Sequence, residues 1–366
     1  MKYIGIVLIL ILAITMIFSG CVKQDNNVVK VGLIVQATGK AVSIGDDVRQ
    51  GVYLGLDEVN KDKNIIQVIF EDDGYDQAKA VVAYRKLVDM DGVKTIIGAV
   101  YSSSTLAIAP LAEHDKVIIF NPGSGDPKIT TAGDFIFRNH ALATQKVEEL
   151  GKYLIKDYNN ISTIYDNSNE TWVLCEKTLV KVFEDANKIV LSRNPFSLND
   201  MDFKTIVDKI KDENVQLIFV GSHMPQSAEI IKELRAEDIN ARIVTEDITT
   251  VDSDFQKILG SLLEGNIFSG TDFDQNTAPE FWAKYTAKYS KNPSMYSAQG
   301  YDNIKILGNI ISNTCKDGNS YCIKDELYKI KDYNGASGNI TIDPNGDALK
   351  PIVIKEIING KFVKLG

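Results

Sequence analysis

Four consecutive hydroxyl-bearing residues, Ser102, Ser103, Ser104 and Thr105, follow an apolar run that ends near Val100. The apolar run predicts a strand and the residues after the hydroxyls predict a helix, so the hydroxyls stand at a helix N-terminus. A carboxylate is stabilised at such a position by the helix dipole and by unpaired backbone N–H groups. The same residues could instead only cap the helix. Two interpretations therefore stay open, a carboxylate-binding site and a helix cap.

Groups that perform catalysis are sparse in this chain. It contains three histidines, His114, His140 and His223, and none has the HExxH-like spacing of a zinc hydrolase. The sequence also contains no GxSxG motif, which would present a nucleophilic serine, and no Walker loop. We therefore expect neither an enzyme nor a metal site.

The cysteines favour an exported protein. Cys315 and Cys322 flank a polar six-residue segment that a disulfide could close outside the reducing cytoplasm. Their spacing, with no companion His or Cys pair, is a poor zinc site. Cys175 lies in an apolar helical stretch, where a buried free thiol is the simplest interpretation.

The N-terminus has the pattern of a secretory signal. Lys2 precedes an apolar run over residues 4–18, and Ser19 and Gly20 stand directly before Cys21. The run is shorter than the roughly 20 residues of a membrane-spanning helix, although a permanent transmembrane anchor is the alternative. Small residues before a cysteine resemble the lipobox of prokaryotic lipoproteins. We predict a signal peptide over residues 1–20, lipidation of Cys21 and a short tether over residues 21–27.

Length and charge restrict the class of protein further. The 366 residues are too many for one compact core, so two lobes are expected. The 40 Lys and Arg against 49 Asp and Glu give a net charge of -9, without a basic cluster. A nucleic-acid partner is therefore not expected.

Strands and helices alternate along the chain after residue 28. An α/β fold with two successive open parallel sheets follows from this alternation, and ligands are expected where the carboxyl ends of the strands face each other. The first series comprises strands 28–35, 65–70, 93–97 and 117–120 and helices 46–60, 76–88 and 103–113. The second comprises helices 141–154, 172–186, 203–211, 227–236 and 252–260 and strands 161–165, 189–192, 215–220 and 242–244.

Several of these segments carry a family resemblance that extends from about residue 28 to the C-terminus. The markers are residues 31–34, 45–51, 71–73, 97–105, 121–124, 300–302 and 338–347, in that order. With them the chain resembles the type I periplasmic solute-binding proteins, in particular the branched-chain amino acid (leucine/isoleucine/valine) binding family of ABC importers. No single marker is specific; their order and spacing are.

The resemblance implies a two-lobed clamp of two Rossmann-like lobes, joined by a hinge of three chain crossings. By this likeness the first lobe comprises residues 28–142 and 271–334, and the second comprises residues 143–270 and 335–366. Members of this family use no cofactor and perform no reaction. Closure of the lobes around the solute creates the surface that the transporter recognises.

The resemblance also assigns site residues in the first lobe. It places the solute carboxylate at Ser102, with Ser103 beside it, and assigns a second contact to residues 122–127, which include Ser124. Gly125 is a departure, because amino acid binders commonly carry Thr there, so one hydroxyl is missing. Tyr101 is a weaker candidate.

In the second lobe the resemblance places Glu246 opposite the solute ammonium, with a solvated acidic loop as the alternative. The aromatic contact of the family falls on His223 or Met224, so a hydrogen-bond donor or an apolar thioether replaces it. Trp172 is expected to line the wall of the site or to pack in the core.

These assignments predict a lipid-anchored solute-binding protein on the outer face of the cytoplasmic membrane, serving the permease of an ABC importer. The expected solute is a branched-chain or other apolar amino acid. An amide or urea-like solute, or a small carboxylate, is the alternative because of Gly125 and the missing aromatic. A ligand-sensing receptor of the same fold is a further alternative.

Overall fold

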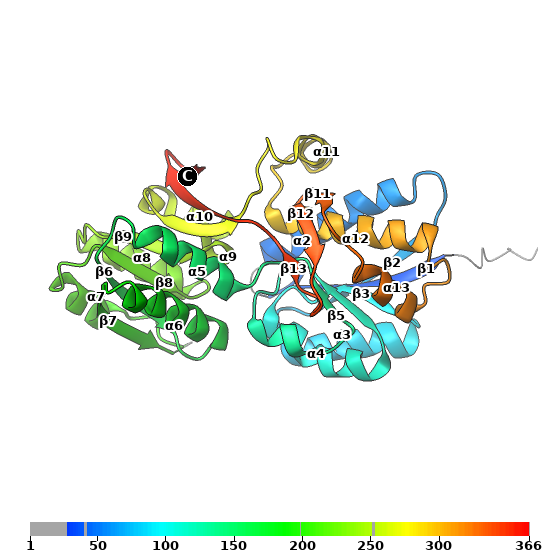
Figure 1. Ribbon diagram of the computed structural model, residues 1–366, viewed down its shortest axis with the longest axis horizontal. Helices are drawn as coiled ribbons and strands as arrows, with labels where there is room; N and C mark the ends of the chain where they lie inside the picture. Colours follow the sequence, from blue (N-terminus) through cyan, green and yellow to red (C-terminus); the bar gives the residue numbers. More distant parts are fainter. Residues whose placement is uncertain (1–27, 40–41, 198, 251–252, 366) are drawn as a thin grey trace, which may run out of the picture.

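Two lobes lie side by side in the computed structural model, which describes residues 28–365 except residues 40–41, 198 and 251–252 (Figure 1). Each lobe is built on its own sheet, and a small third sheet lies beside the first lobe. The predicted signal peptide, tether and lipidated Cys21 lie outside the described residues. The two-lobed α/β architecture expected from the alternation is confirmed.

The first lobe contains a five-stranded sheet in the order β2-β1-β3-β4-β5, and all its pairings are parallel. Its strands are short and mostly buried, as expected of a sheet that is covered on both faces. They are β1 (Val29–Val35), β2 (Ile66–Asp72), β3 (Thr95–Gly98), β4 (Ile118–Asn121) and β5 (Ile136–Arg138).

Helices cover both faces of this sheet. The helices α2 (Val42–Val59) and α12 (Met295–Asn313) share one core cluster, and α3 (Gln77–Arg85), η1 (Lys86–Met90), α4 (Ser102–Asp115) and η2 (Pro127–Thr131) contribute to the other. α11 (Pro279–Tyr289) packs on the outer side of α2 and α12. The two long helices cross in close contact at Gly51, where a Cβ atom would lie 1.9 Å from the carbonyl oxygen of Ser297. Only glycine permits this approach.

The second lobe contains a seven-stranded sheet in the order β15-β14-β10-β9-β8-β6-β7. Five strands run parallel, whereas the last two pair antiparallel at one edge, so the sheet is mixed and not purely parallel as expected. The strands are β6 (Asn160–Asp166), β7 (Ile189–Phe196), β8 (Leu217–Gly221), β9 (Arg242–Glu246), β10 (Ile267–Thr271), β14 (Ile352–Ile358) and β15 (Lys361–Leu365).

Two groups of helices enclose this second sheet. α5 (Ala143–Leu154) and α6 (Glu170–Asp185) form one apolar cluster with it, and the remaining helices lie toward the other. The remaining helices are α7 (Lys204–Lys211), α8 (Gln226–Ala236), α9 (Asp247–Thr250), α10 (Ser253–Leu259) and η3 (Gly260–Leu263).

The chain passes between the lobes three times, near residues 139–142, 272–278 and 350–351. The third crossing lies later than the expected position at residue 335. Residues 335–349 pack with the first lobe, because Ile340, Ile342 and Ala348 lie in the same cluster as Val31. These residues belong to a three-stranded antiparallel sheet of β11 (Tyr333–Gly335), β12 (Gly338–Ile342) and β13 (Ala348–Leu349). Only β14 and β15 of the C-terminal segment join the second lobe (Figure 1).

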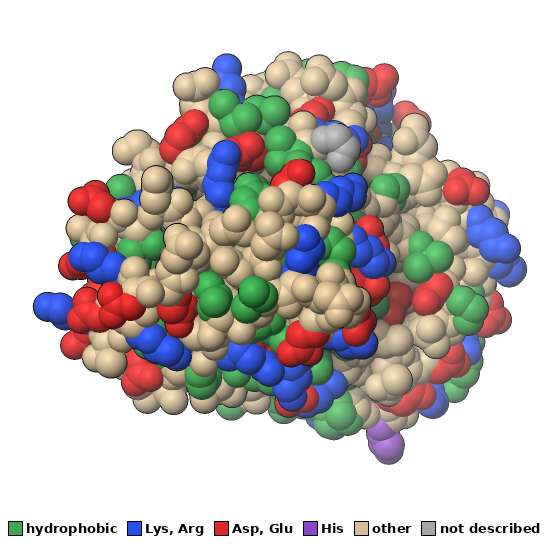
Figure 2. Space-filling view, turned by 60° about the vertical axis from the view of Figure 1, so that its left-hand side comes forward, with side chains coloured by type: hydrophobic (Ala, Val, Ile, Leu, Met, Phe, Trp, Pro, Cys, Tyr) green, Lys and Arg blue, Asp and Glu red, His purple; other side chains and the backbone are tan. Residues whose placement is uncertain are grey.

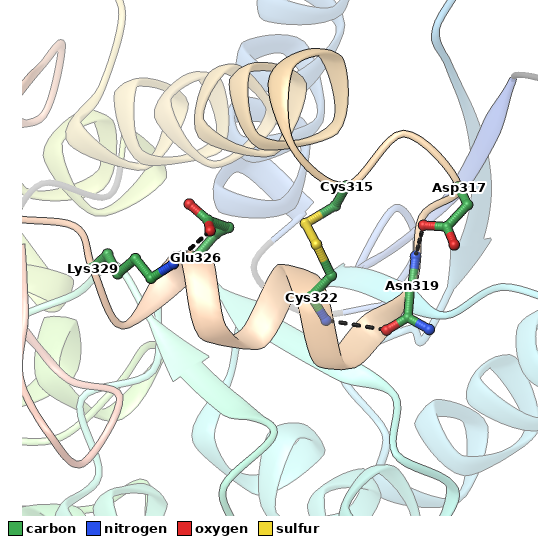
Figure 3. The surroundings of a disulfide bond; sticks show 6 residues. All are labelled: Cys315, Asp317, Asn319, Cys322, Glu326 and Lys329. Carbon is green, nitrogen blue, oxygen red and sulfur yellow. Dashed lines mark hydrogen bonds and ion pairs between the residues drawn. A yellow bond between two sulfur atoms is a disulfide. The ribbon is translucent and has the colours of Figure 1, made fainter.

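A disulfide joins Cys315 and Cys322, which links the end of α12 to α13 (Ser320–Leu327) (Figure 3). Asn319 caps α13, since its side chain accepts a hydrogen bond of 3.1 Å from the backbone N–H of Cys322. Cys315 is buried in the core of the first lobe. The third described cysteine, Cys175, is a buried free thiol, and burial raises its pKa well above the usual value.

Among the helices of the described residues, none combines the length and apolar character needed to cross a bilayer. Basic and acidic side chains are interspersed on the face of the molecule in Figure 2, and neither sign dominates a broad patch there. This mixed face agrees with the absence of basic clusters in the sequence.

Candidate functional site

The loop after β3 brings Tyr101 and Ser102 to the start of α4. Tyr101 occupies the N-cap position, and its side chain makes no capping hydrogen bond. Ser102 is therefore already the first helical residue, so the expected role of these serines as a helix cap is not what the geometry shows. The Ser102 hydroxyl accepts a hydrogen bond of 3.3 Å from the backbone N–H of Asp126, while Ser103 is exposed. The helix N-terminus thus stands beside the loop that follows β4.

Ser124 lies in that second loop and is 1% exposed. Its hydroxyl lies 3.0 Å from the carbonyl oxygen of Val100, 2.8 Å from Asn121 Nδ2 and 2.9 Å from Thr105 Oγ1. One donor and two acceptor positions are all that a hydroxyl has, so this network occupies them. In this structure Ser124 therefore supports the loop from within the first lobe.

Gly125, the departure from the family pattern, touches the start of the second lobe. Its carbonyl oxygen accepts a hydrogen bond of 3.0 Å from the backbone N–H of Ala143 at the start of α5. A Cβ atom on Gly125 would lie 3.1 Å from the Ala143 Cβ atom and 3.2 Å from its nitrogen, which is tighter than ordinary contact. A threonine at position 125 would therefore be crowded by Ala143, where the chain enters the second lobe.

Arg138, at the end of β5, anchors the loop after β4 and was not predicted from the sequence. Its side chain is 0% exposed, and its Nε atom lies 2.5 Å from Asp347 Oδ1. The guanidinium also donates to the Asp126 carbonyl at 2.7 Å and to Thr130. The available signal was an arginine directly after the apolar run 135–137, because a guanidinium carried into the core by such a run needs partners.

Contacts between the lobes lie next to this loop. The Thr171 hydroxyl, from the start of α6, donates a hydrogen bond of 2.9 Å to Asp126 Oδ2. Close by in sequence, Lys128 pairs with Glu170 at 3.1 Å, but both side chains are more than half exposed, so this ion pair contributes little. The buried Asp126 carboxylate is therefore the stronger polar link.

Aromatic rings form a continuous row across the two lobes. The ring centroids of Tyr75 and Tyr101 lie 4.1 Å apart, those of Tyr101 and His223 lie 5.7 Å apart, and those of His223 and Trp172 lie 5.1 Å apart. Each pair has an edge-to-face arrangement. The structure thus brings together Tyr101, His223 and Trp172, whereas Met224 packs against the core of the second lobe.

Trp172 contributes a polar atom as well as a ring. It is 2% exposed, and within the described part of the chain no acceptor lies within hydrogen-bond distance of its Nε1 atom. A buried indole N–H usually finds an acceptor. Trp172 therefore offers a donor between the lobes.

Glu246 ends β9, but it already has a cationic partner within the protein. Lys146, from the buried face of α5, contacts Glu246 and lies 2.5 Å from Asp247 Oδ1. The Lys146 ammonium is also 3.1 Å from His140 Nε2. His140 in turn contacts the amide of Gln299 on α12, so this cluster links both lobes beside the first crossing.

Lys146 was not identified from the sequence, although a signal was present. It lies between Ala143, Val147 and Leu150, which are buried on the apolar face of the same helix. A lysine in that phase of an amphipathic helix is unusual unless it is paired. Its partners, about 100 residues further along the chain, carry no mark in the sequence.

The charged groups of this cluster shift one another's pKa values. Burial acts to lower the pKa of Lys146, but attraction to Asp247 and Glu246 outweighs burial, so the pKa is raised. Burial and then Lys146 lower the pKa of His140 to about 3, which keeps its imidazole neutral. Burial and the neighbouring Asp247 raise the pKa of Glu246, and Lys146 helps to hold the pKa of Asp247 low against burial.

The same cluster brings together three side chains that could ligate a metal ion. Possible ligand atoms of His140, Glu246 and Asp247 lie within 4.8 Å of one another. The Lys146 ammonium contacts all three side chains, so it supplies the positive charge at the point where they converge.

His223 should make the stability of the protein depend on pH. Burial lowers its pKa to about 4, although Asp166 opposes the shift. An unfolded histidine binds a proton as the pH falls through about 6.5, whereas the folded protein does not until about pH 4. Acidification from pH 7 to pH 5 should therefore cost about 1–2 kcal/mol through this residue. Between pH 7 and pH 5 the His223→Gln variant should therefore lose about 1–2 kcal/mol less stability than the wild type. Urea unfolding at both pH values measures this difference. The same loss of stability in the two proteins would contradict the prediction.

Comparison with known proteins agrees with the two-lobed fold. A family model for periplasmic binding proteins matches residues 28–361. A leucine-, isoleucine-, valine-, threonine- and alanine-binding protein of Pseudomonas aeruginosa is 25% identical over 331 residues, which cover 87% of each chain. The crystal structure of the leucine-binding protein LivK from Thermotoga maritima has a TM-score of 0.85 at 26% identity, covering 93% of this chain and 98% of that chain.

A more distant structure shares the fold. The solute-binding protein of an ABC transporter from Rhodopseudomonas palustris, in complex with 3,4-dihydroxybenzoic acid, has a TM-score of 0.83 at 21% identity, covering 93% of this chain and 96% of that chain. The family match spans nearly all of the described residues, and its members are exported solute-binding proteins. The chain therefore belongs to the periplasmic binding protein family, as a type I member similar to the Leu/Ile/Val-binding proteins.

Proposed function

We propose that the protein is the extracytoplasmic solute-binding component of an ABC importer, held on the outer face of the cytoplasmic membrane by a lipid on Cys21. Its role is binding and not catalysis, and its macromolecular partner is the permease of that importer. The family membership supports the solute-binding role, and the signal-like N-terminal sequence supports the anchor. A sensing receptor of the same fold is the alternative.

The solute is proposed to bind between the lobes, at the row of Tyr101, His223 and Trp172. The observation that carries this proposal is that the row draws its members from both lobes, beside the N-terminus of α4 at Ser102. A solute held there contacts both lobes, so binding favours the closed arrangement. The helix N-terminus and the indole N–H suit a carboxylate and the rings suit an apolar body.

The proposed solute is therefore a small organic molecule with a carboxylate. A branched-chain or other apolar amino acid is one class, supported by the amino-acid-binding relatives. A carboxylic acid without an amine is the other, and the structurally similar protein from Rhodopseudomonas palustris holds one of this kind. Urea-like solutes and amides lack the carboxylate that this site is suited to.

A thermal-shift panel of amino acids, small carboxylic acids, amides and urea tests this proposal. A true solute at 100-fold excess over its Kd stabilises the folded protein by about 2.7 kcal/mol, so the melting temperature should rise by several degrees. The shift should grow with concentration for carboxylates only. A panel in which no carboxylate raises the melting temperature would exclude the proposed solute class.

Lipidation is tested by the mass of the protein extracted from membranes. We expect loss of residues 1–20 and an added diacylglyceryl group on Cys21, with Cys21→Ala releasing the protein from the membrane fraction. An intact Met1, or an unmodified Cys21 in the membrane-bound protein, would contradict the anchor.

A further inference from the structure

Lys146 stands where the family likeness would place the ammonium group of a solute. The likeness pairs Glu246 with that ammonium, yet in the structure the Glu246 carboxylate contacts Lys146. Lys146, Glu246 and Asp247 are 0%, 2% and 1% exposed. An ammonium has three N–H donors, and Lys146 directs them to Glu246, Asp247 and the neutral imidazole of His140. Every donor of this lysine is therefore matched by an acceptor.

The cluster has no excess negative charge that could attract a second ammonium. Lys146 and Asp247 carry opposite charges, and His140 is neutral because burial lowers its pKa. Glu246 holds its proton more strongly than an exposed glutamate does, because burial and Asp247 both disfavour its charged form. With that proton in place the cluster is neutral, so it does not attract a cation.

Displacement of Lys146 by a solute would also be costly. It lies between Ala143 and Val147 on the buried face of α5, so its stem is packed in the core of the second lobe. A solute ammonium that displaced it would leave a buried, unpaired cation, which costs several kcal/mol. Replacement of Lys146 by a solute group is therefore unfavourable.

Several other polar groups of the proposed site are donors. Ser102 and the N-terminus of α4 present O–H and N–H groups, and the Trp172 indole N–H has no acceptor among the described residues. These donors suit the oxygen atoms of an acid. The Asp166 carboxylate, which acts on His223, already accepts hydrogen bonds from the backbone N–H and the hydroxyl of Ser168. Gly125 removes one more side-chain oxygen that could accept from an ammonium.

From this geometry we propose that Lys146 acts as an internal substitute for the solute ammonium, so that the site selects small carboxylic acids that lack an α-amino group. This inference rests on the proposed function, because it assumes that the solute binds between the lobes. It makes Lys146 a specificity-determining residue that acts through Glu246 and Asp247.

Matched pairs of ligands test the proposal by isothermal titration on the purified protein. Leucine is compared with 4-methylpentanoate, and phenylalanine with 3-phenylpropanoate, so that each pair differs only in the amino group. We expect the wild-type protein to bind the amine-free acid of at least one pair at least about 10-fold more tightly than the amino acid. Lys146→Met leaves the Asp247 carboxylate without its cation, so an incoming ammonium can take that place and the preference should reverse toward the amino acid.

Lys152→Met is the matched control. Lys152 lies on the same helix but pairs at the surface with Glu148 and Glu149, so its removal should leave the preference unchanged. The double variant Lys146→Met, Asp247→Asn removes both charges of the buried ion pair and should bind neither amino acid better than the wild type does.

Each outcome decides a separate point. An amino acid that binds the wild type as tightly as its amine-free partner overturns the inference and leaves the proposed function intact. If neither member of either pair binds any of the proteins, the proposed site for apolar carboxylates is wrong. Should Lys146→Met fail to fold, the comparison of ligand pairs on the wild type still decides the inference.

Discussion

Replacing Arg138 by methionine is expected to lower the free energy of unfolding by about 3–5 kcal/mol. The guanidinium is fully buried and holds Asp347 together with the Asp126 carbonyl. Its removal leaves the Asp347 carboxylate, itself 6% exposed, without its cation. Chemical denaturation followed by circular dichroism measures the loss.

Two further variants serve as controls for this prediction. Arg138→Met with Asp347→Asn should lose less stability than the sum of the two single variants, because the pair is coupled. Lys181→Met breaks an ion pair with Asp185 in which both side chains are largely exposed, and should change stability by less than about 1 kcal/mol. A loss below about 1 kcal/mol for Arg138→Met would show that the buried pair is not the anchor of the loop.

Ser102→Asp should weaken binding of the proposed carboxylate solute by at least about 100-fold. Two carboxylates about 5 Å apart repel each other by roughly 3 kcal/mol at an effective dielectric constant of 20. Folding should be retained, because a negative charge in the first turn of α4 is favourable to the helix. Titration calorimetry measures the affinity, and thermal unfolding without solute checks the fold.

Ser103→Asp is the control for this prediction. Ser103 follows Ser102 in the same helix turn but is exposed, so solvent and salt screen a charge there. Its effect on affinity should stay within about fivefold. Equal losses of affinity for the two variants would point to a general electrostatic effect. An unchanged affinity for Ser102→Asp would contradict binding of the solute carboxylate at the N-terminus of α4.

Local patterns predicted the elements well because they depend on neighbouring residues. The expected helix over residues 141–154 corresponds to α5, and the expected strand over residues 161–165 lies within β6. Hydrophobic periodicity contains this information directly. The last crossing was placed about 15 residues too early, since the short strands β12 and β13 carry no local sign of the lobe against which they pack.

The residues of the proposed site also differ in how far the sequence predicted their roles. Tyr101, Trp172 and His223 were proposed from the sequence, and the structure brings their rings together across the two lobes. Ser102, also proposed, lies next to Tyr101 at the start of α4. Ser124 was identified too, but its hydroxyl is occupied by Thr105, Asn121 and Val100, which only folding brings together. Glu246 was expected opposite the solute ammonium or in a solvated acidic loop, whereas the structure shows it buried and in contact with Lys146.

By itself the sequence determined the class of fold, the N-terminal signal pattern and the segments at the carboxyl ends of the strands, because these depend on periodicity and order along the chain. The tertiary structure decided which charges meet. Lys146 and Glu246 are 100 residues apart in the sequence, and Asp126 and Thr171 are 45 residues apart. Burial makes both of these contacts energetically important. Partners at such separations leave no local pattern, so the specificity that Lys146 is proposed to impose follows from folding alone.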